Sequence, residues 1–203
     1  MNILKYFNYN SYVTLSFFFL SLIVLILHYV TGGWTTKKIF STERSSLFNP
    51  LTYIRFFTHE LGHIDYSHFS SNFLKILLLG PIIEEKYGSI NFLIMILITA
   101  FITGVVNYII GKSRLCGASN IAFMLIILSS IVNISEGKIP LTLVLIILFY
   151  IADEIKDLLL KKNDGISHIG HITGAICGGI LGFISLHYDL KELLFSFLSI
   201  INL

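Results

Sequence analysis

Charge is scarce in this sequence. Only 13% of its 203 residues are aspartate, glutamate, lysine or arginine, whereas roughly a quarter is usual in soluble domains. The formal net charge of +2 is too small to indicate nucleic-acid binding. There are two cysteines, Cys116 and Cys177, and each lies in or beside an apolar segment. This excludes a disulfide framework and a metal cluster held by thiolates. The length allows one compact bundle and no separate soluble domain.

Long apolar runs are what the sequence has instead. Hydrophobic residues make up 55% of the chain, and the mean hydropathy is +0.81. Runs of membrane-spanning length recur along it. The sequence therefore predicts an all-α fold, a polytopic membrane helical bundle that forms a single domain over residues 1–203. The six predicted transmembrane helices cover residues 12–31, 68–84, 90–111, 117–134, 140–156 and 169–187, with an interfacial first loop at 32–67 and a C-terminal tail at 188–203.

Polar side chains stand at the start of three of these spans. Successive spans alternate in direction, so the second, fourth and sixth all begin at the same face of the membrane. His68 and Asn72 begin the second span and are four residues apart, on one helix face. Ser119 begins the fourth span and His171 the sixth. Polar groups inside a bilayer are costly and usually mark a functional site, so we expect these four side chains to meet.

The residue types at this level indicate acyl transfer. A serine hydroxyl becomes a nucleophile when a base takes its proton, and His171 is the candidate base for Ser119. The oxyanion that forms needs hydrogen-bond donors, which His68, Asn72 and the backbone at Ala118 would supply. Gly117 leaves room for a close approach of the backbone.

Glycines recur every fourth residue in the sixth span. Such a stripe lets two helices approach closely in a membrane. It predicts that the helix carrying His171 packs tightly on a neighbour, which we expect to be the helix carrying Ser119. The stripe consists of Gly174, Gly178 and Gly182.

These motifs together resemble those of the rhomboid family of intramembrane serine proteases. Residues 63–72 (HIDYSHFSSN) are similar to the second-helix motif of the family, and residues 80–89 (GPIIEEKYGS) to the end of that helix. Gly117-Ala118-Ser119 resembles the Gly-x-Ser nucleophile motif, and residues 171–178 (HITGAICG) resemble the sixth-helix histidine motif. The resemblance runs over residues 50–187 in the expected order.

The resemblance implies the fold and the chemistry of a rhomboid protease. It implies a Ser119–His171 dyad without a third acidic member, and an oxyanion hole from His68, Asn72 and the backbone near Ser119. It implies that the enzyme cleaves transmembrane segments of other proteins in the lipid bilayer, without a metal or other cofactor. It also implies a cytoplasmic amino terminus. Supporting positions implied by the motifs are His63, Gly117, Phe123, Glu84 and Arg55.

Three positions depart from the family pattern. Asn120 replaces the glycine that usually follows the serine, and Ile54 replaces the tryptophan before Arg55. Phe123 lies where many members carry a tyrosine that packs on the catalytic histidine. Phenylalanine can stack in the same way but has no hydroxyl group.

A second motif supports a competing hypothesis. His59-Glu60-Leu61-Gly62-His63 is an HExxH sequence, which is typical of zinc metalloproteases. His68 or Asp164 would supply the third ligand, so an intramembrane zinc protease is one alternative. A catalytically inactive rhomboid-like binder of membrane proteins is another, although members of that kind usually lack the serine or the histidine.

The sequence therefore predicts an intramembrane serine endopeptidase, a hydrolase that uses Ser119 and His171. Its expected partners are transmembrane protein substrates and the bilayer, with no nucleic acid. The frequent use of isoleucine, lysine and asparagine indicates a bacterium, and hence a multi-pass protein of the inner (plasma) membrane. Substrate identity and oligomeric state are left open.

Overall fold

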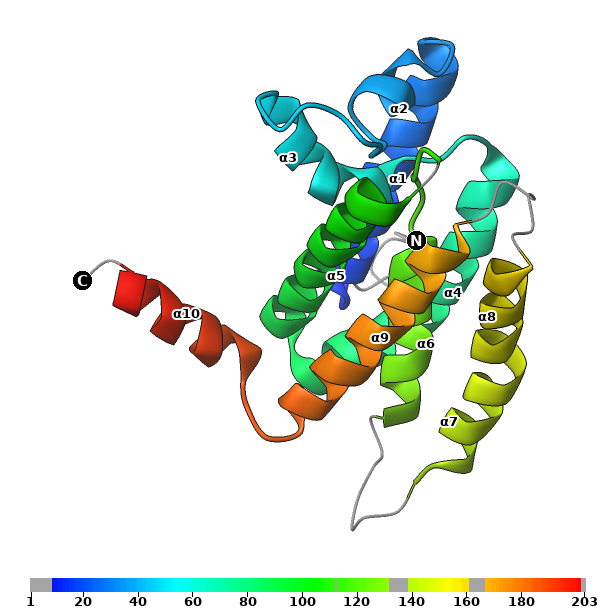
Figure 1. Ribbon diagram of the computed structural model, residues 1–203. Coiled ribbons are helices and arrows are strands. Elements are labelled where there is room, and N and C mark those ends of the chain that lie inside the picture. Colours follow the sequence, from blue (N-terminus) through cyan, green and yellow to red (C-terminus); the bar gives the residue numbers. More distant parts are fainter. Residues whose placement is uncertain (1–8, 112, 132–138, 161–166, 202–203) are drawn as a thin grey trace, which may run out of the picture.

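The bundle is built from five longer helices. The computed structural model describes residues 9–111, 113–131, 139–160 and 167–201, and within them the chain is helical apart from connecting loops. Figure 1 shows the longer helices side by side. They are α1 (Tyr12–Val30), α4 (Tyr66–Tyr87), α5 (Ser89–Ile110), α6 (Ser119–Ile131) and α9 (His168–Ser185).

Shorter helices surround this body. The predicted first loop contains α2 (Trp34–Lys38), α3 (Pro50–Thr58) and a 3₁₀ turn, η2 (His59–Leu61). Three further segments are joined end to end without a break and lie beside α6 and α9. These are α7 (Leu141–Ile146), the π-helical turn η3 (Ile147–Ile151) and α8 (Ala152–Leu159). The last helix, α10 (Leu190–Ile201), leads away from the bundle (Figure 1).

The predicted all-α membrane bundle is confirmed. By length and composition, three of the described helices (α1, α5 and α9) are apolar enough to cross a membrane. α6 is apolar but shorter, at 13 residues, and nearly all of its side chains are buried because it packs against α4, α5 and α9. The count of six spans stays a prediction. Residues 132–134, the end of the fourth predicted span, lie outside the described residues.

The first loop is folded onto the bundle by hydrogen bonds to backbone carbonyl groups. The Arg55 guanidinium donates to the carbonyl oxygen of Lys38 at the end of α2, with an Nε–O distance of 2.7 Å. Thr58 donates to Ile39 in the same stretch, at 2.6 Å. Arg55 thus has an anchoring contact although Ile54 beside it is half exposed.

Glu84 ties the amino end of α1 to the carboxyl end of α4. Its carboxylate accepts hydrogen bonds from the backbone N–H groups of Val13 and Thr14, both at 2.9 Å, and from the Ser89 hydroxyl at 2.6 Å. The first N–H groups of a helix have no partner within the helix, and its dipole favours a negative charge there. Glu84 is therefore a structural side chain at the end of the bundle away from the starts of α4 and α6.

α6 and α9 are in the closest contact of the bundle. A Cβ atom added to Gly174 would overlap the carbonyl oxygen of Asn120, and one added to Gly178 would lie 2.5 Å from the carbonyl oxygen of Met124. At Gly182 the nearest atom is a methyl group of Leu128, at 3.0 Å. The glycine stripe of α9 therefore lies on α6, and at Gly174 and Gly178 the backbone of α6 leaves no room for a side chain.

Candidate active site

The four polar side chains lie at one end of the bundle. Figure 1 shows α4, α6 and α9 beginning at the same end, the end near α2 and α3. Two of the three helix starts are capped by a side chain. Asp65 accepts from the backbone N–H of His68 at 2.7 Å, and Ser167 accepts from that of Gly170 at 3.3 Å. Such caps satisfy N–H groups that have no partner within the helix.

Gly117 brings His68 and Asn72 next to the nucleophile segment. Its φ of +116° is in the region that favours glycine. A Cβ atom there would lie 2.5 Å from His68 Nε2 and 3.5 Å from Asn72 Nδ2. The His68 imidazole and the Asn72 amide thus lie against Gly117, two positions before Ser119. Ser119 is the first residue of α6 and is partly exposed.

Two contacts hold the ring of His171. Phe123, one turn after Ser119 on α6, stacks on it with 4.3 Å between ring centroids and 13° between planes. Glu154 on α8 bonds to its Nδ1 atom, with 2.9 Å between Nδ1 and Oε1. In the described part of the chain no hydrogen bond joins Ser119 to Nε2 of His171. Catalytic hydrogen bonds are often long without substrate and shorten in the reacting complex.

His63 supports the loop before Ser119. Its Nδ1–H group donates to the Leu61 carbonyl oxygen at 3.2 Å, so Nε2 acts as an acceptor. Nε2 receives the backbone N–H of Ala118 and the amide of Asn72, both at 3.3 Å. Burial lowers the pKa of His63 to about 3, with a smaller contribution from His68 in the same direction. His63 is therefore a neutral acceptor at physiological pH.

These bonds affect the predicted oxyanion donors differently. The N–H group of Ala118 is already bonded to His63. Asn72 has two N–H donors and uses one of them on His63. His68 faces Gly117 with its Nε2 atom, and its buried Nδ1 atom has no hydrogen-bond partner among the described residues. The side chains of His68 and Asn72 therefore have donor capacity left, whereas Ala118 has to release His63 first.

The two histidines of the HExxH sequence bond to different parts of the protein. His59 and Glu60 are in η2, and the distance from His59 Nε2 to Glu60 Oε1 is 3.1 Å. His63 instead bonds towards α4 and α6. Glu60 accepts from Thr103 of α5 at 3.1 Å and from Asn120 of α6 at 2.9 Å. In this arrangement Glu60 connects the first loop to two helices and is not positioned between two histidine ligands.

One group of potential metal ligands does occur among the described residues, at another place. The ligand atoms of Glu154, His168 and His171 lie within 4.8 Å of one another. His59 and His63 belong to no such group in the described ranges, and Asp164 lies outside them. Among the described residues, the geometry therefore gives His59 and His63 no third ligand.

Glu154 is the site residue that the sequence reasoning missed. The alternating direction of the spans brings together the beginnings of the second, fourth and sixth. The fifth span must end at the face where these begin, and Glu154 is near its end. Asp153 and Asp157 are on the same helix, so the sequence alone does not indicate which acid turns toward His171.

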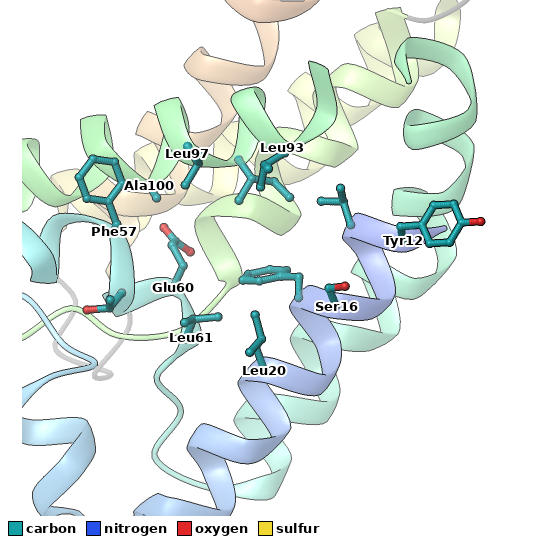
Figure 2. A pocket seen from close by; sticks show the side chains of 13 residues that line it. Tyr12, Ser16, Leu20, Phe57, Glu60, Leu61, Leu93, Leu97 and Ala100 are labelled. Atoms are coloured by element: carbon teal, nitrogen blue, oxygen red, sulfur yellow. The ribbon is translucent and has the colours of Figure 1, made fainter. Parts of the chain in front are cut away.

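A separate apolar cavity lies between α1 and α5. It has a volume of about 400 Å³ and contains neither Ser119 nor His171 in its lining. Figure 2 shows Tyr12 of α1 at one end and Glu60 and Leu61 of η2 at the other. We therefore place the chemistry at the helix starts and not in this cavity.

Comparison with known proteins adds one finding. The family model of the Rhomboid domain matches residues 50–188, a stretch that contains every polar residue of the candidate site. A search of curated proteins finds no match.

Proposed function

Because this chain belongs to the rhomboid family, we propose that it is an intramembrane serine endopeptidase that cleaves transmembrane segments of other proteins. It is an integral membrane protein, and we place it in a bacterial plasma membrane. The observation that carries the proposal is the convergence of Ser119, His171, His68 and Asn72 at the starts of three adjacent helices.

The first half of the proposed reaction forms an acyl-enzyme. Nε2 of His171 takes the hydroxyl proton of Ser119 as Oγ attacks the carbonyl carbon of the scissile peptide bond. The oxyanion of the tetrahedral intermediate receives hydrogen bonds from the side chains of His68 and Asn72. When the intermediate collapses, the C–N bond breaks and His171 gives its proton to the departing amine.

The second half returns the enzyme to its starting state. A water molecule enters from the face at which α4, α6 and α9 begin, and His171 takes one of its protons. The resulting hydroxide attacks the ester carbonyl, again with His68 and Asn72 facing the oxyanion. The ester C–O bond breaks, the carboxylic acid leaves, and Ser119 recovers its proton from His171. Each half uses only side chains of this chain, and no metal or other cofactor.

The experiment that tests this function is cleavage of model transmembrane substrates in proteoliposomes. We expect wild-type protein to cut at least one of them, and Ser119→Ala and His171→Ala to lose the activity. Ser129→Ala is the matched control for the serine because it lies on the same helix and its hydroxyl bonds to the backbone of Ile126. His187→Ala is the matched control for the histidine because its side chain is exposed near the end of α9.

Each competing function gives a distinct result. Activity that survives in Ser119→Ala would contradict the serine mechanism. Activity that a chelator abolishes and zinc restores, together with sensitivity to His59→Ala, would support the metalloprotease. A fluorophosphonate probe separates the inactive binder from an enzyme whose substrate is missing. Such a probe labels an activated serine without a protein substrate, so we expect labelling of wild type and none of Ser119→Ala.

A further inference from the structure

Glu154 joins the catalytic histidine to the helix at the edge of the bundle. Its two carboxylate oxygens bond to two histidines that are one turn apart on α9. Oε1 lies 2.9 Å from His171 Nδ1, and Oε2 lies 2.7 Å from His168 Nδ1. The carboxylate is largely buried, with 16% of its side-chain surface exposed. We propose that Glu154 is a positioning residue for His171, so that Ser119, His171 and Glu154 form a triad in place of the dyad that the family resemblance implies; this inference rests on the proposed function.

The contact fixes which ring nitrogen of His171 can act as the base. A carboxylate only accepts hydrogen bonds, so Nδ1 of the neutral imidazole must carry the proton. The lone pair is then on Nε2, the atom that has to take the proton of Ser119. Once it has done so, the positive imidazolium faces the negative carboxylate. In serine hydrolases with a third acid, that acid performs the same two tasks.

His168 keeps the carboxylate from turning. A carboxylate held at one oxygen can rotate about its last bond, whereas Glu154 is held at both. His168 is almost fully buried, with 6% exposure, so its ring is itself fixed by packing. The three side chains therefore form a rigid unit between α8 and α9.

Phe123 and Glu154 constrain different motions of the His171 ring. Phe123 stacks on its face and stops the ring from tilting. Glu154 bonds in the plane of the ring and stops it from flipping about the Cβ–Cγ bond. With both contacts present, a single orientation of Nε2 remains. This is the kind of preorganisation that general-base catalysis needs.

The same contacts tie catalysis to the position of α8. No described residue of α8 is fully buried, so the helix is not held by a core of its own. Apolar contacts to the bundle come from the preceding segments, where Leu143 and Ile146 of α7 and Ile151 of η3 pack against a small cluster on α6 and α9. This cluster consists of Phe123, Ile127, Ile131 and Ala175. Displacement of α8 would remove the acceptor from His171 Nδ1.

The test compares Glu154→Gln with Asp153→Asn. Glutamine has nearly the shape of glutamate, but its amide has one acceptor oxygen and no charge. It therefore cannot accept from both rings or balance the imidazolium. Asp153 is the adjacent, exposed carboxylate and serves as the matched control. We expect Glu154→Gln to lower kcat by about 100-fold with KM within twofold, because positioned general bases contribute about 10²–10⁴. We expect Asp153→Asn to leave both constants unchanged.

Two further readouts separate positioning from a purely structural role. The labelling rate of Ser119 by a fluorophosphonate should fall with kcat, because it reports activation of the serine without substrate binding. Glu154→Asp restores a carboxylate and should recover part of the rate. If Glu154→Gln keeps kcat within twofold of wild type, the proposal is overturned. Ser119→Ala is measured in the same assay as Glu154→Gln. If the proposed function itself is wrong, Ser119→Ala will keep its activity, so the two failures can be distinguished.

A measurement on the wild type covers the case in which the variant does not fold. Nitrogen-15 spectra of histidine-labelled protein in lipid, assigned with His171→Ala, distinguish the two neutral forms of the ring. We expect the Nδ1–H form for His171, and the Nε2–H form would overturn the proposal. A divalent cation held by the same three side chains would also overturn it. In that case a chelator would abolish activity and zinc would restore it.

Discussion

Asn120 and Glu60 form a buried pair that links the first loop to the nucleophile helix. Glu60 is 1% exposed, and its Oε1 atom accepts from the Asn120 amide at 2.9 Å. Oε2 of Glu60 has no hydrogen-bond partner among the described residues. A buried carboxylate that loses a donor bears the full cost of desolvation. The asparagine after Ser119 is thus accommodated by a glutamate sixty positions away.

We predict that Asn120→Ala lowers the free energy of unfolding by about 1–3 kcal/mol, because it leaves Oε1 of Glu60 with one donor fewer. The measurement is unfolding by a denaturing detergent from mild micelles, followed by circular dichroism. A double-mutant cycle with Glu60→Gln should show coupling between the two positions. Strictly additive effects would mean that the pair is not an energetic unit.

Because of His63, the folded protein is expected to lose stability as the pH falls. The pKa of His63 in the folded state is about 3, compared with 6.5 for an unperturbed histidine. Below pH 6.5 the unfolded chain binds a proton at His63 that the folded chain does not bind. The contribution of this residue to stability is therefore intact above pH 6.5 and is lost progressively as the pH falls toward 3.

We predict that wild-type protein becomes less stable between pH 6.5 and pH 5, and that His63→Gln shows a smaller slope over this interval. The interval lies above the usual range of carboxylate titration. His187→Gln, at an exposed position after α9, is the matched control for replacing a histidine by glutamine. Equal slopes for wild type and His63→Gln would contradict the assignment.

At the scale of elements, the close packing of α6 on α9 contributes to the stability of the protein. Gly178 and Gly179 are neighbours on α9 with opposite surroundings. A Cβ atom at Gly178 would lie 2.5 Å from the backbone oxygen of Met124, whereas one at Gly179 would have no atom within 4 Å. The pair therefore separates the effect of close helix packing from the general effect of alanine in a helix.

We predict that Gly178→Ala destabilises the protein by about 1–3 kcal/mol, as overpacking of a tight contact does, and that Gly179→Ala has no such cost. The detergent unfolding assay compares the two. Gly178→Ala should also slow substrate cleavage, since pushing α9 away from α6 moves His171 relative to Ser119. Similar stabilities of the two variants would show that the close approach is not a tight contact in the membrane.

At the scale of the whole molecule, local pattern and the alternation of spans were enough to predict the long helices and the end of the bundle at which four polar residues lie. The apolar runs predicted the helices. The alternating direction of the spans predicted that the helices beginning at Ser119, at His171 and at the pair His68 and Asn72 start at one end of the bundle. The contacts of Glu60 with Asn120 and Thr103, and of Glu154 with His171, join segments far apart in the chain. No periodicity encodes which of several acids makes such a contact. The HExxH spacing places two histidines on one face only in a continuous helix, whereas here His59 and Glu60 lie in the 3₁₀ turn η2 and the turn ends before His63.

Membrane orientation remains the whole-molecule property on which sequence and family disagree. The connections on the side of the first loop carry more lysine and arginine than those on the other side, and the positive-inside rule would place them in the cytoplasm. In the folded protein, however, several of these cations are engaged within the chain. Arg55 donates to Lys38, Arg44 donates to the end of α5, and Arg114 pairs with Glu43 at 2.8 Å.

We therefore predict the family orientation, with the amino terminus in the cytoplasm and the site facing outward. In a background without Cys116 and Cys177, Ser113→Cys should react with a membrane-impermeant maleimide on intact spheroplasts. Asp189→Cys should react only after permeabilisation, and both positions are exposed. The reverse pattern would show that the charge rule decides the orientation. Reaction of both from the same side would contradict the six-span count, because an odd number of spans must separate residue 113, before the fourth, from residue 189, after the sixth.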